Sequence, residues 1–162
     1  MPIYIDYNTT LEEESLRSQN HNITKKHNPS SWVRPVKLEK KNEILNKLKT
    51  IESFDEGWDG YGALVPSLNV FENTKKFINS LDEYYIEKLN IEGFYASPYG
   101  TFFIEWIKGN KMVSVEIGHD LFGYYSQNLI SEISEDGISF KEIPKELYNS
   151  LKEMYPVFVF EL

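Results

Sequence analysis

Two glutamates and a histidine are the residues of this chain whose types and spacing could do chemistry. Glu105 and Glu116 lie in two segments of alternating character, and His119-Asp120 follows directly. Two carboxylates can act as general acid and general base, or bind a metal, when their surroundings separate their pKa values. Glu105, Glu116 and His119 are therefore the candidate groups of a hydrolase-type enzyme or a small-ligand site, with Asp59 as a possible fourth member.

A simpler explanation exists for each of these residues. An antiparallel sheet with one face in water commonly carries glutamates on that face. Adjacent residues of a strand point to opposite faces, so His119 and Asp120 would not converge within a strand. The chain has no His-Glu-x-x-His or His-x-Glu spacing and no cysteine, so we expect no metal site and no cofactor.

A second candidate site is the glycine-rich segment 55–63, Asp-Glu-Gly-Trp-Asp-Gly-Tyr-Gly-Ala. Its glycines can adopt positive φ, and Asp59 can accept hydrogen bonds from nearby backbone N–H groups. Trp58 and Tyr61 are expected to bury their rings against the adjoining helices or, in a binding loop, to contact a ligand. The segment matches neither an EF-hand loop nor a phosphate-binding loop. Trp58, Asp59 and Tyr61 join the two glutamates and the histidine as candidate ligand- or partner-binding residues.

Two amphipathic helices are expected to flank this segment. Apolar residues recur at helical spacing over about 37–54 and again after Pro66-Ser67. Ser67 predicts an N-cap whose hydroxyl accepts a bond from the first turn, and the second helix is expected to end between Asp82 and Ile86. Helices joined by a short connector pack against each other or share one face of a sheet.

Strands follow the helices. Gly109-Asn110 predicts a two-residue hairpin turn in which Lys108 faces Lys111. In that register Phe102, Ile104 and Trp106 lie opposite Ile117, Val115 and Val113, which creates one apolar face for the helices. Further strands are expected at 94–96, 122–127, 129–134 and 138–142, with a turn at 135–137 and a short helix beginning at Pro144.

These patterns predict an α+β fold. We expect two N-terminal helices packed on one face of an antiparallel sheet of about four to six strands, followed by a short C-terminal helix. Residues 1–35 have a linker-like composition and are expected to be poorly ordered or loosely attached, with 36–162 as a single domain. The apolar run 157–160 is expected to join the sheet, enter the core or contact a partner, for example in a homodimer.

Composition narrows the functional classes. The chain has 162 residues, a formal net charge of −8, 15% aromatic residues and no cysteine. An acidic surface repels phosphate backbones, so direct nucleic-acid binding is disfavoured. The absence of cysteine suits the cytoplasm, where we place the protein, and excludes disulfides and thiolate chemistry. We expect neither a membrane-spanning helix nor a signal peptide.

Two motifs carry a resemblance. The segment Gly57-Trp58-Asp59-Gly60-Tyr61-Gly62-Ala63 and the later Gly100-to-Trp106 stretch, which contains Ile-Glu-Trp, resemble a group of uncharacterised small bacterial proteins with a Trp-Asp-Gly-x-Gly-Ala segment. The resemblance covers about residues 40 to 126. It implies a shared fold and brings no established activity.

The sequence favours binding over catalysis, because it holds no recognisable nucleophile, base and acid set. Our main hypothesis is a non-catalytic protein-interaction or regulatory module of a bacterium or phage, with an antitoxin-, immunity- or defence-accessory-like role and a protein partner. The alternative is a small-ligand-binding protein or hydrolase-type enzyme that uses Glu105, Glu116 and His119.

Overall fold

The computed structural model describes residues 37–156, which belong to the second of the two units into which the chain divides, Pro35–Leu162. The expectations for residues 1–35 and for the apolar run 157–160 lie outside the described residues. No helix within 37–156 is long and apolar enough to cross a membrane.

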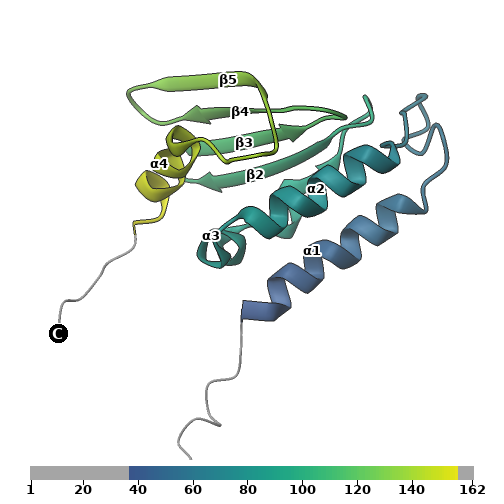
Figure 1. Ribbon diagram of the computed structural model, residues 1–162, viewed down its shortest axis with the longest axis horizontal. Coiled ribbons are helices and arrows are strands. Elements are labelled where there is room, and N and C mark those ends of the chain that lie inside the picture. Colours follow the sequence, from purple (N-terminus) through teal and green to yellow (C-terminus); the bar gives the residue numbers. More distant parts are fainter. Residues whose placement is uncertain (1–36, 157–162) are drawn as a thin grey trace, which may run out of the picture. The chain divides into compact units, whose positions relative to one another are not determined.

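Five antiparallel strands form one sheet in the order β1-β2-β3-β4-β5, so each strand pairs with its neighbour in sequence (Figure 1). They are β1 Phe94–Ala96, β2 Phe102–Lys108, β3 Lys111–Ile117, β4 Phe122–Gln127 and β5 Glu132–Ile138. Lys108 pairs with Lys111 and Ile104 with Val115, which confirms the predicted hairpin register. Consecutive pairing of this kind is what short connections between strands produce.

The helices lie on one face of this sheet or pack on one another (Figure 1). They are α1 Lys37–Glu52, α2 Leu68–Ser80, α3 Glu83–Lys88, the 3₁₀ turn η2 Ile91–Gly93 and α4 Lys145–Met154. The chain from α1 onward therefore confirms the α+β prediction, with α1, α2 and an additional short helix α3 before the sheet and the short helix α4 after it.

Two details of the predicted helices are wrong. Ser67 occupies the N-cap position of α2, but its side chain makes no cap hydrogen bond. The second helix ends at Ser80, and a separate helix α3 begins after Asp82, whose carboxylate accepts a 2.8 Å bond from the Tyr84 N–H. An aspartate is a strong N-cap, so it divides a stretch whose apolar spacing suggests one continuous helix.

The predicted ending of the sheet is also wrong. The last turn is at Asn128–Ser131, and β5 then runs through the Asp136-Gly137 step where the turn was expected. The Asn128 side chain accepts 2.8 Å bonds from the N–H groups of both Ile130 and Ser131. This Asx turn closes the hairpin before the Asp-Gly pair is reached.

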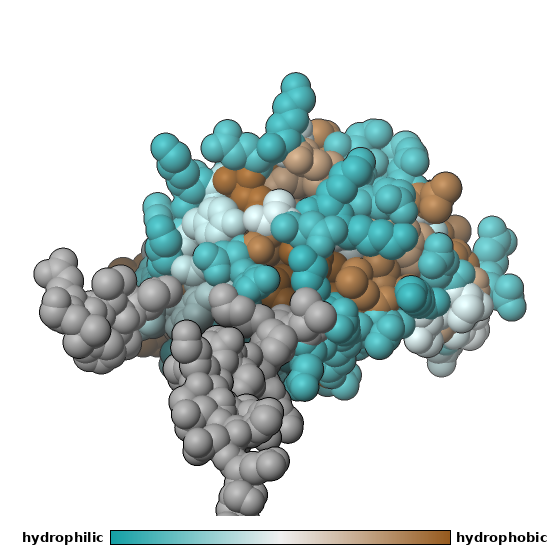
Figure 2. Space-filling model, turned by 60° about the horizontal axis from the view of Figure 1, so that its bottom comes forward, coloured by the Kyte–Doolittle hydropathy of each residue, from teal (hydrophilic) through white to brown (hydrophobic). Residues whose placement is uncertain are grey.

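One face of the sheet supplies the core. Trp106 is 1% exposed, and its indole N–H donates a 2.9 Å bond to the carbonyl of Tyr85 in α3. Phe71 of α2 meets Phe102 edge to face with ring centroids 5.2 Å apart, and Leu147 and Leu151 of α4 are fully buried. We call this the covered face. The exterior in Figure 2 is mainly hydrophilic, with apolar patches among polar side chains.

Candidate functional site

The opposite face of the same sheet carries both predicted glutamates. We call it the open face and define it by the alternate residues that point away from the covered face: Tyr95, Phe103, Glu105, Ile107, Met112, Ser114, Glu116, Gly123, Tyr125, Gln127, Glu132, Ser134 and Asp136. Most of them remain partly or fully exposed, whereas most of their neighbours on the covered side of β1 to β4 are buried. The strands therefore present these side chains to solvent or to a partner.

Glu105 is held in a fixed position on this face. Its carboxylate accepts a 3.2 Å bond from the Ser114 hydroxyl on β3 and lies close enough to Tyr95 on β1 to affect the ionisation of that phenol. Burial, and then the charge of Glu105, raise the pKa of Tyr95 to about 12. The Tyr95 ring stacks on Phe103 with centroids 5.5 Å apart. A carboxylate positioned by a hydroxyl can orient a cationic or donor group of a ligand.

The loop between β1 and β2 supplies the hydrogen bond that positions the Glu116 carboxylate. Its carboxylate accepts a 2.8 Å bond from the Thr101 hydroxyl, which lies 2.7 Å from the hydroxyl of Ser97. Glu116 pairs with Phe103 across the strands, while Glu105 pairs with Ser114. The two glutamates thus share a face and are offset by one step, as the predicted register required.

A hollow of about 230 Å³ lies beside Glu116, over Gly123 of β4. Its outward-facing lining residues are Phe103, Ser114, Glu116, Gly123, Tyr125, Ser134 and Asp136. A Cβ atom on Gly123 would lie 2.3 Å from Asp136 Oδ1 and 3.2 Å from the Glu135 carbonyl oxygen. The hollow therefore depends on a glycine at this position, where the pairing between β4 and β5 is also irregular.

Asp136 and Ser134 were not among the predicted site residues. The predicted turn at 135–137 removed Asp136 from the sheet, whereas β5 places both residues on the open face. The usable signal was Gly123, because a glycine inside an aromatic strand marks a bulge or a close approach of another segment.

Negative charge on the open face is not neutralised by lysine or arginine within residues 37–156. All outward-facing charged residues of the five strands are acidic: Glu105, Glu116, Glu132 and Asp136. The lysines of the β2–β3 hairpin bond to α4 instead, Lys108 to the Met154 carbonyl at 3.0 Å and Lys111 to Glu153 at 3.2 Å. Carboxylates next to exposed rings form a surface that attracts cations.

The glycine-rich segment forms a tight loop between α1 and α2. Gly57, Gly60 and Gly62 have φ of 75°, 80° and 94°. Asp59 accepts bonds from the N–H groups of Tyr61 at 2.8 Å and Ala63 at 3.0 Å. These backbone bonds hold the pKa of the Asp59 carboxyl below its usual value. Asp59 therefore accepts backbone hydrogen bonds within the loop, as predicted, and its side chain is engaged by them.

The two aromatic residues of this loop behave differently. Trp58 is half-buried, packs on Phe54 with ring centroids 5.2 Å apart, and donates its indole N–H to the Leu64 carbonyl at 3.3 Å. Tyr61 is 96% exposed, so the prediction that its ring is buried is wrong. The internal bonds of Asp59 fix the loop without the Tyr61 ring.

His119 lies away from the two glutamates. Its Nε2 is 2.8 Å from the Asn69 side-chain nitrogen at the start of α2, and its Nδ1 is 2.9 Å from Asp120 Oδ1. His119 and Asp120 contact each other because they lie in the turn between β3 and β4, where strand alternation no longer applies. The structure brings Glu105 and Glu116 to one face and joins His119 to α2 instead.

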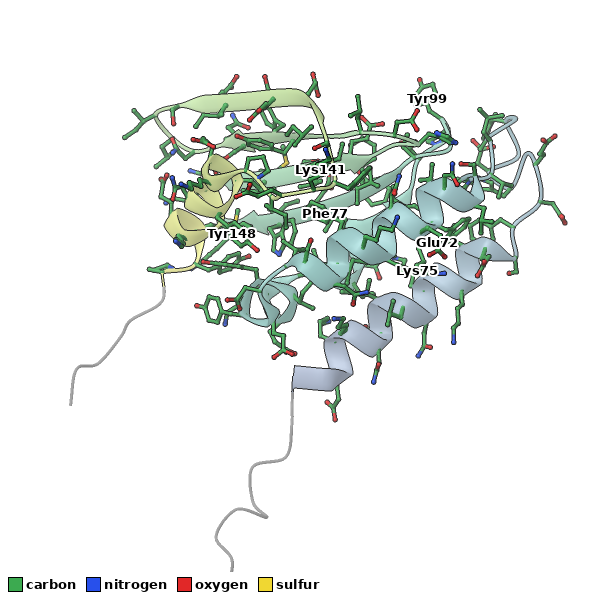
Figure 3. The ribbon with its side chains drawn as sticks, viewed as in Figure 1. Glu72, Lys75, Phe77, Tyr99, Lys141 and Tyr148 are labelled. Atoms are coloured by element: carbon green, nitrogen blue, oxygen red, sulfur yellow. The ribbon has the colours of Figure 1, made fainter. Side chains whose placement is uncertain are left out.

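Other exposed features lie elsewhere on the molecule. Tyr99, 82% exposed and labelled in Figure 3, lies in the β1–β2 loop and forms a backbone bridge with Leu64. A hollow of about 560 Å³ between the start of α3 and α4 is lined by Asp82, Tyr85, Lys145, Tyr148, Asn149 and Lys152. None of the predicted site residues lines this second hollow.

Residues 37–156 contain no group of three or more histidine or acidic side chains arranged to hold a metal ion. Comparisons with protein-family models, curated proteins and solved structures found no match. The resemblance to bacterial proteins with the Trp-Asp-Gly-x-Gly-Ala segment thus stays a prediction.

Proposed function

We propose that this protein is a non-catalytic protein-interaction module whose open face binds a positively charged segment of a partner protein. The observation that carries the proposal is the hollow over Gly123, where the Glu116 and Asp136 carboxylates lie beside the Phe103 and Tyr125 rings. Carboxylates give charge-assisted hydrogen bonds to arginine or lysine, and ring faces add cation–π attraction.

The charge distribution supports a basic partner over a nucleic acid or a second acidic protein. The open face is acidic throughout, and the chain as a whole carries a net charge of −8. Complementary charge steers encounter and excludes partners of like charge. An antitoxin-, immunity- or defence-accessory role in a bacterium or phage would use such a surface and remains our proposal for the biological setting.

The enzyme alternative receives less support. Glu105 is bonded to Ser114, and His119 to Asn69 and Asp120, so the three proposed catalytic groups do not converge. A catalytic set needs a point about 3 Å from both the nucleophile and the stabilising donors. The open face offers positioned carboxylates without a neighbouring nucleophile-base pair.

The test uses a synthetic peptide of alternating arginine and valine, with a glutamate-valine peptide of the same length as control. We expect the double variant Glu116→Gln/Asp136→Asn to bind the basic peptide about tenfold more weakly, since two exposed charge pairs of roughly 0.5–1 kcal/mol each are lost. Isothermal titration calorimetry at low and physiological salt measures both affinities.

A matched variant separates the site from the overall charge. Glu39→Gln/Glu52→Gln removes the same two charges from exposed positions on α1, which packs on α2 and α3. The proposal requires this control to bind the peptide within about twofold of the parent protein, because screened charges at a distance contribute little. Equal losses in both double variants, or equal binding of the acidic peptide, would overturn the proposal.

A further inference from the structure

The strand at the edge of the open face defines how a partner could bind. β5, Glu132–Ile138, pairs with β4 on one side, and no described strand pairs with its other side (Figure 1). Six of its seven residues are exposed. An exposed edge of this length presents a row of free backbone N–H and C=O groups to an added strand.

The alternation of antiparallel hydrogen bonds indicates which backbone groups are free. The Asn128 N–H bonds to the Ser131 carbonyl at 3.0 Å, which closes the hairpin with a hydrogen-bonded pair. Bonded and non-bonded pairs then alternate along β4 and β5, so Glu132 and Ser134 fall in non-bonded pairs. Their N–H and C=O groups point away from β4, toward the free edge.

The side chains of β5 set the chemistry of an added strand. Glu132, Ser134 and Asp136 point to the open face, so a strand beside them would place alternate residues next to two carboxylates. On the other face the same strand would meet Ile133, which is 44% exposed, the exposed Glu135 and the half-buried Ile138. Alternating basic and apolar residues are complementary to this edge.

A second copy of the chain does not fit the edge as well. Antiparallel pairing of two β5 strands about Ser134 would place Glu132 of one copy opposite Asp136 of the other. Like charges directly opposite each other destabilise a strand pair. The acids therefore oppose self-pairing and favour a basic strand.

From these observations we infer that the partner segment adds to the sheet as an extended sixth strand along β5, with basic residues at the alternate positions that face Glu132, Ser134 and Asp136. The inference rests on the proposed function and specifies its mode: backbone pairing provides the alignment, and the open-face carboxylates select the basic side chains. Side chains at the centre of such a strand extend over the hollow at Gly123.

The decisive variant is Ser134→Pro. Proline removes an N–H that faces the free edge and leaves the ladder to β4 intact, the position at which edge strands tolerate it. We expect the arginine-valine peptide to bind at least about tenfold more weakly. The variant lacks one backbone donor, and its proline ring also blocks close approach of the added strand. Circular dichroism and thermal unfolding confirm that the variant folds, and Ser134→Ala serves as the control for loss of the hydroxyl.

A second measurement does not depend on a variant. Amide hydrogen exchange followed by NMR should show the Glu132 and Ser134 N–H groups exchanging fast in the free protein and at least about tenfold more slowly with saturating arginine-valine peptide. A peptide that carries N-methyl groups on the backbone nitrogens facing β5 should lose this protection and bind at least about tenfold more weakly.

The outcomes separate the two proposals. Suppose that Glu116→Gln/Asp136→Asn loses binding while Ser134→Pro keeps full binding and unchanged exchange. That result would keep the open-face site and overturn strand addition. Full binding in all of these variants would overturn both. Light scattering that shows a dimer abolished by Ser134→Pro would also overturn the inference, because a second copy would then occupy the edge.

Discussion

The same five strands build two faces that differ in almost every respect. On β2, Phe102, Ile104 and Trp106 point to the covered face and are at most 1% exposed, whereas Phe103 and Glu105 point the other way and stay partly exposed. α2 and α4 contact the sheet on the covered side, and the open face keeps its rings and carboxylates accessible. Strand alternation sorts the residues between the two faces, and helix placement decides which set stabilises the fold and which is available for binding.

The largest difference in stability is expected when one ring is truncated on each face of β2. We expect Trp106→Ala to lower the free energy of unfolding by about 3–5 kcal/mol, because it leaves a cavity and removes the bond to the Tyr85 carbonyl. Phe103→Ala on the open face should cost roughly 1 kcal/mol, since its ring is only partly buried. Urea unfolding measures both, and similar losses would show that the two faces contribute equally to stability.

A methyl group at Gly123 tests the contact between β4 and β5. Gly123→Ala should destabilise the protein by roughly 1–3 kcal/mol, because the new Cβ meets Asp136 Oδ1 and the backbone oxygen of Glu135. The same change should weaken binding of the basic peptide by filling the floor of the hollow. Gln127→Ala, an exposed open-face position on the same strand, is the control, and thermal unfolding with equal midpoints for both variants would contradict the predicted clash.

The pKa of Tyr95 reports on burial and charge at the open face. Its folded pKa of about 12 lies above the ordinary value of 10, so its contribution to stability is complete below pH 10 and is lost as pH rises toward 12. Glu105→Gln removes the nearby negative charge and should lower the pKa of Tyr95, although burial still holds it above the ordinary value. NMR of ¹³C-labelled tyrosine between pH 9 and 13 follows the ring. An unchanged titration in Glu105→Gln would show that burial alone sets the pKa.

The smallest expected effect concerns the carboxylates of the proposed site. Glu116→Gln/Asp136→Asn should change the free energy of unfolding by no more than about 0.5 kcal/mol, since both side chains are exposed. Chemical denaturation of the variant used for peptide binding measures this directly. A large loss of stability would assign these carboxylates to the fold and remove the functional contrast between the two faces.

Much of the fold follows from local sequence. Gly109-Asn110 and the alternation on either side of it set the β2–β3 register, and the apolar spacing of 37–54 sets α1. The predicted element boundaries are wrong where one polar side chain outweighs the hydrophobic pattern around it. Asp82 ends a helical run, and Asn128 closes a turn ahead of Asp136-Gly137. Side-chain capping of this kind involves two or three atoms and leaves little trace in hydrophobic periodicity.

The sequence by itself determined that Glu105 and Glu116 share one face of a hairpin, because strand alternation and a two-residue turn are local properties. It also determined that the Asp59 loop turns on its glycines. Only the tertiary structure decided that Asp136 lies beside Gly123, that His119 bonds to Asn69, and that Tyr61 is exposed. These outcomes depend on contacts between segments that are distant along the chain or on packing around the loop, where shape and burial outweigh the preferences of neighbouring residues.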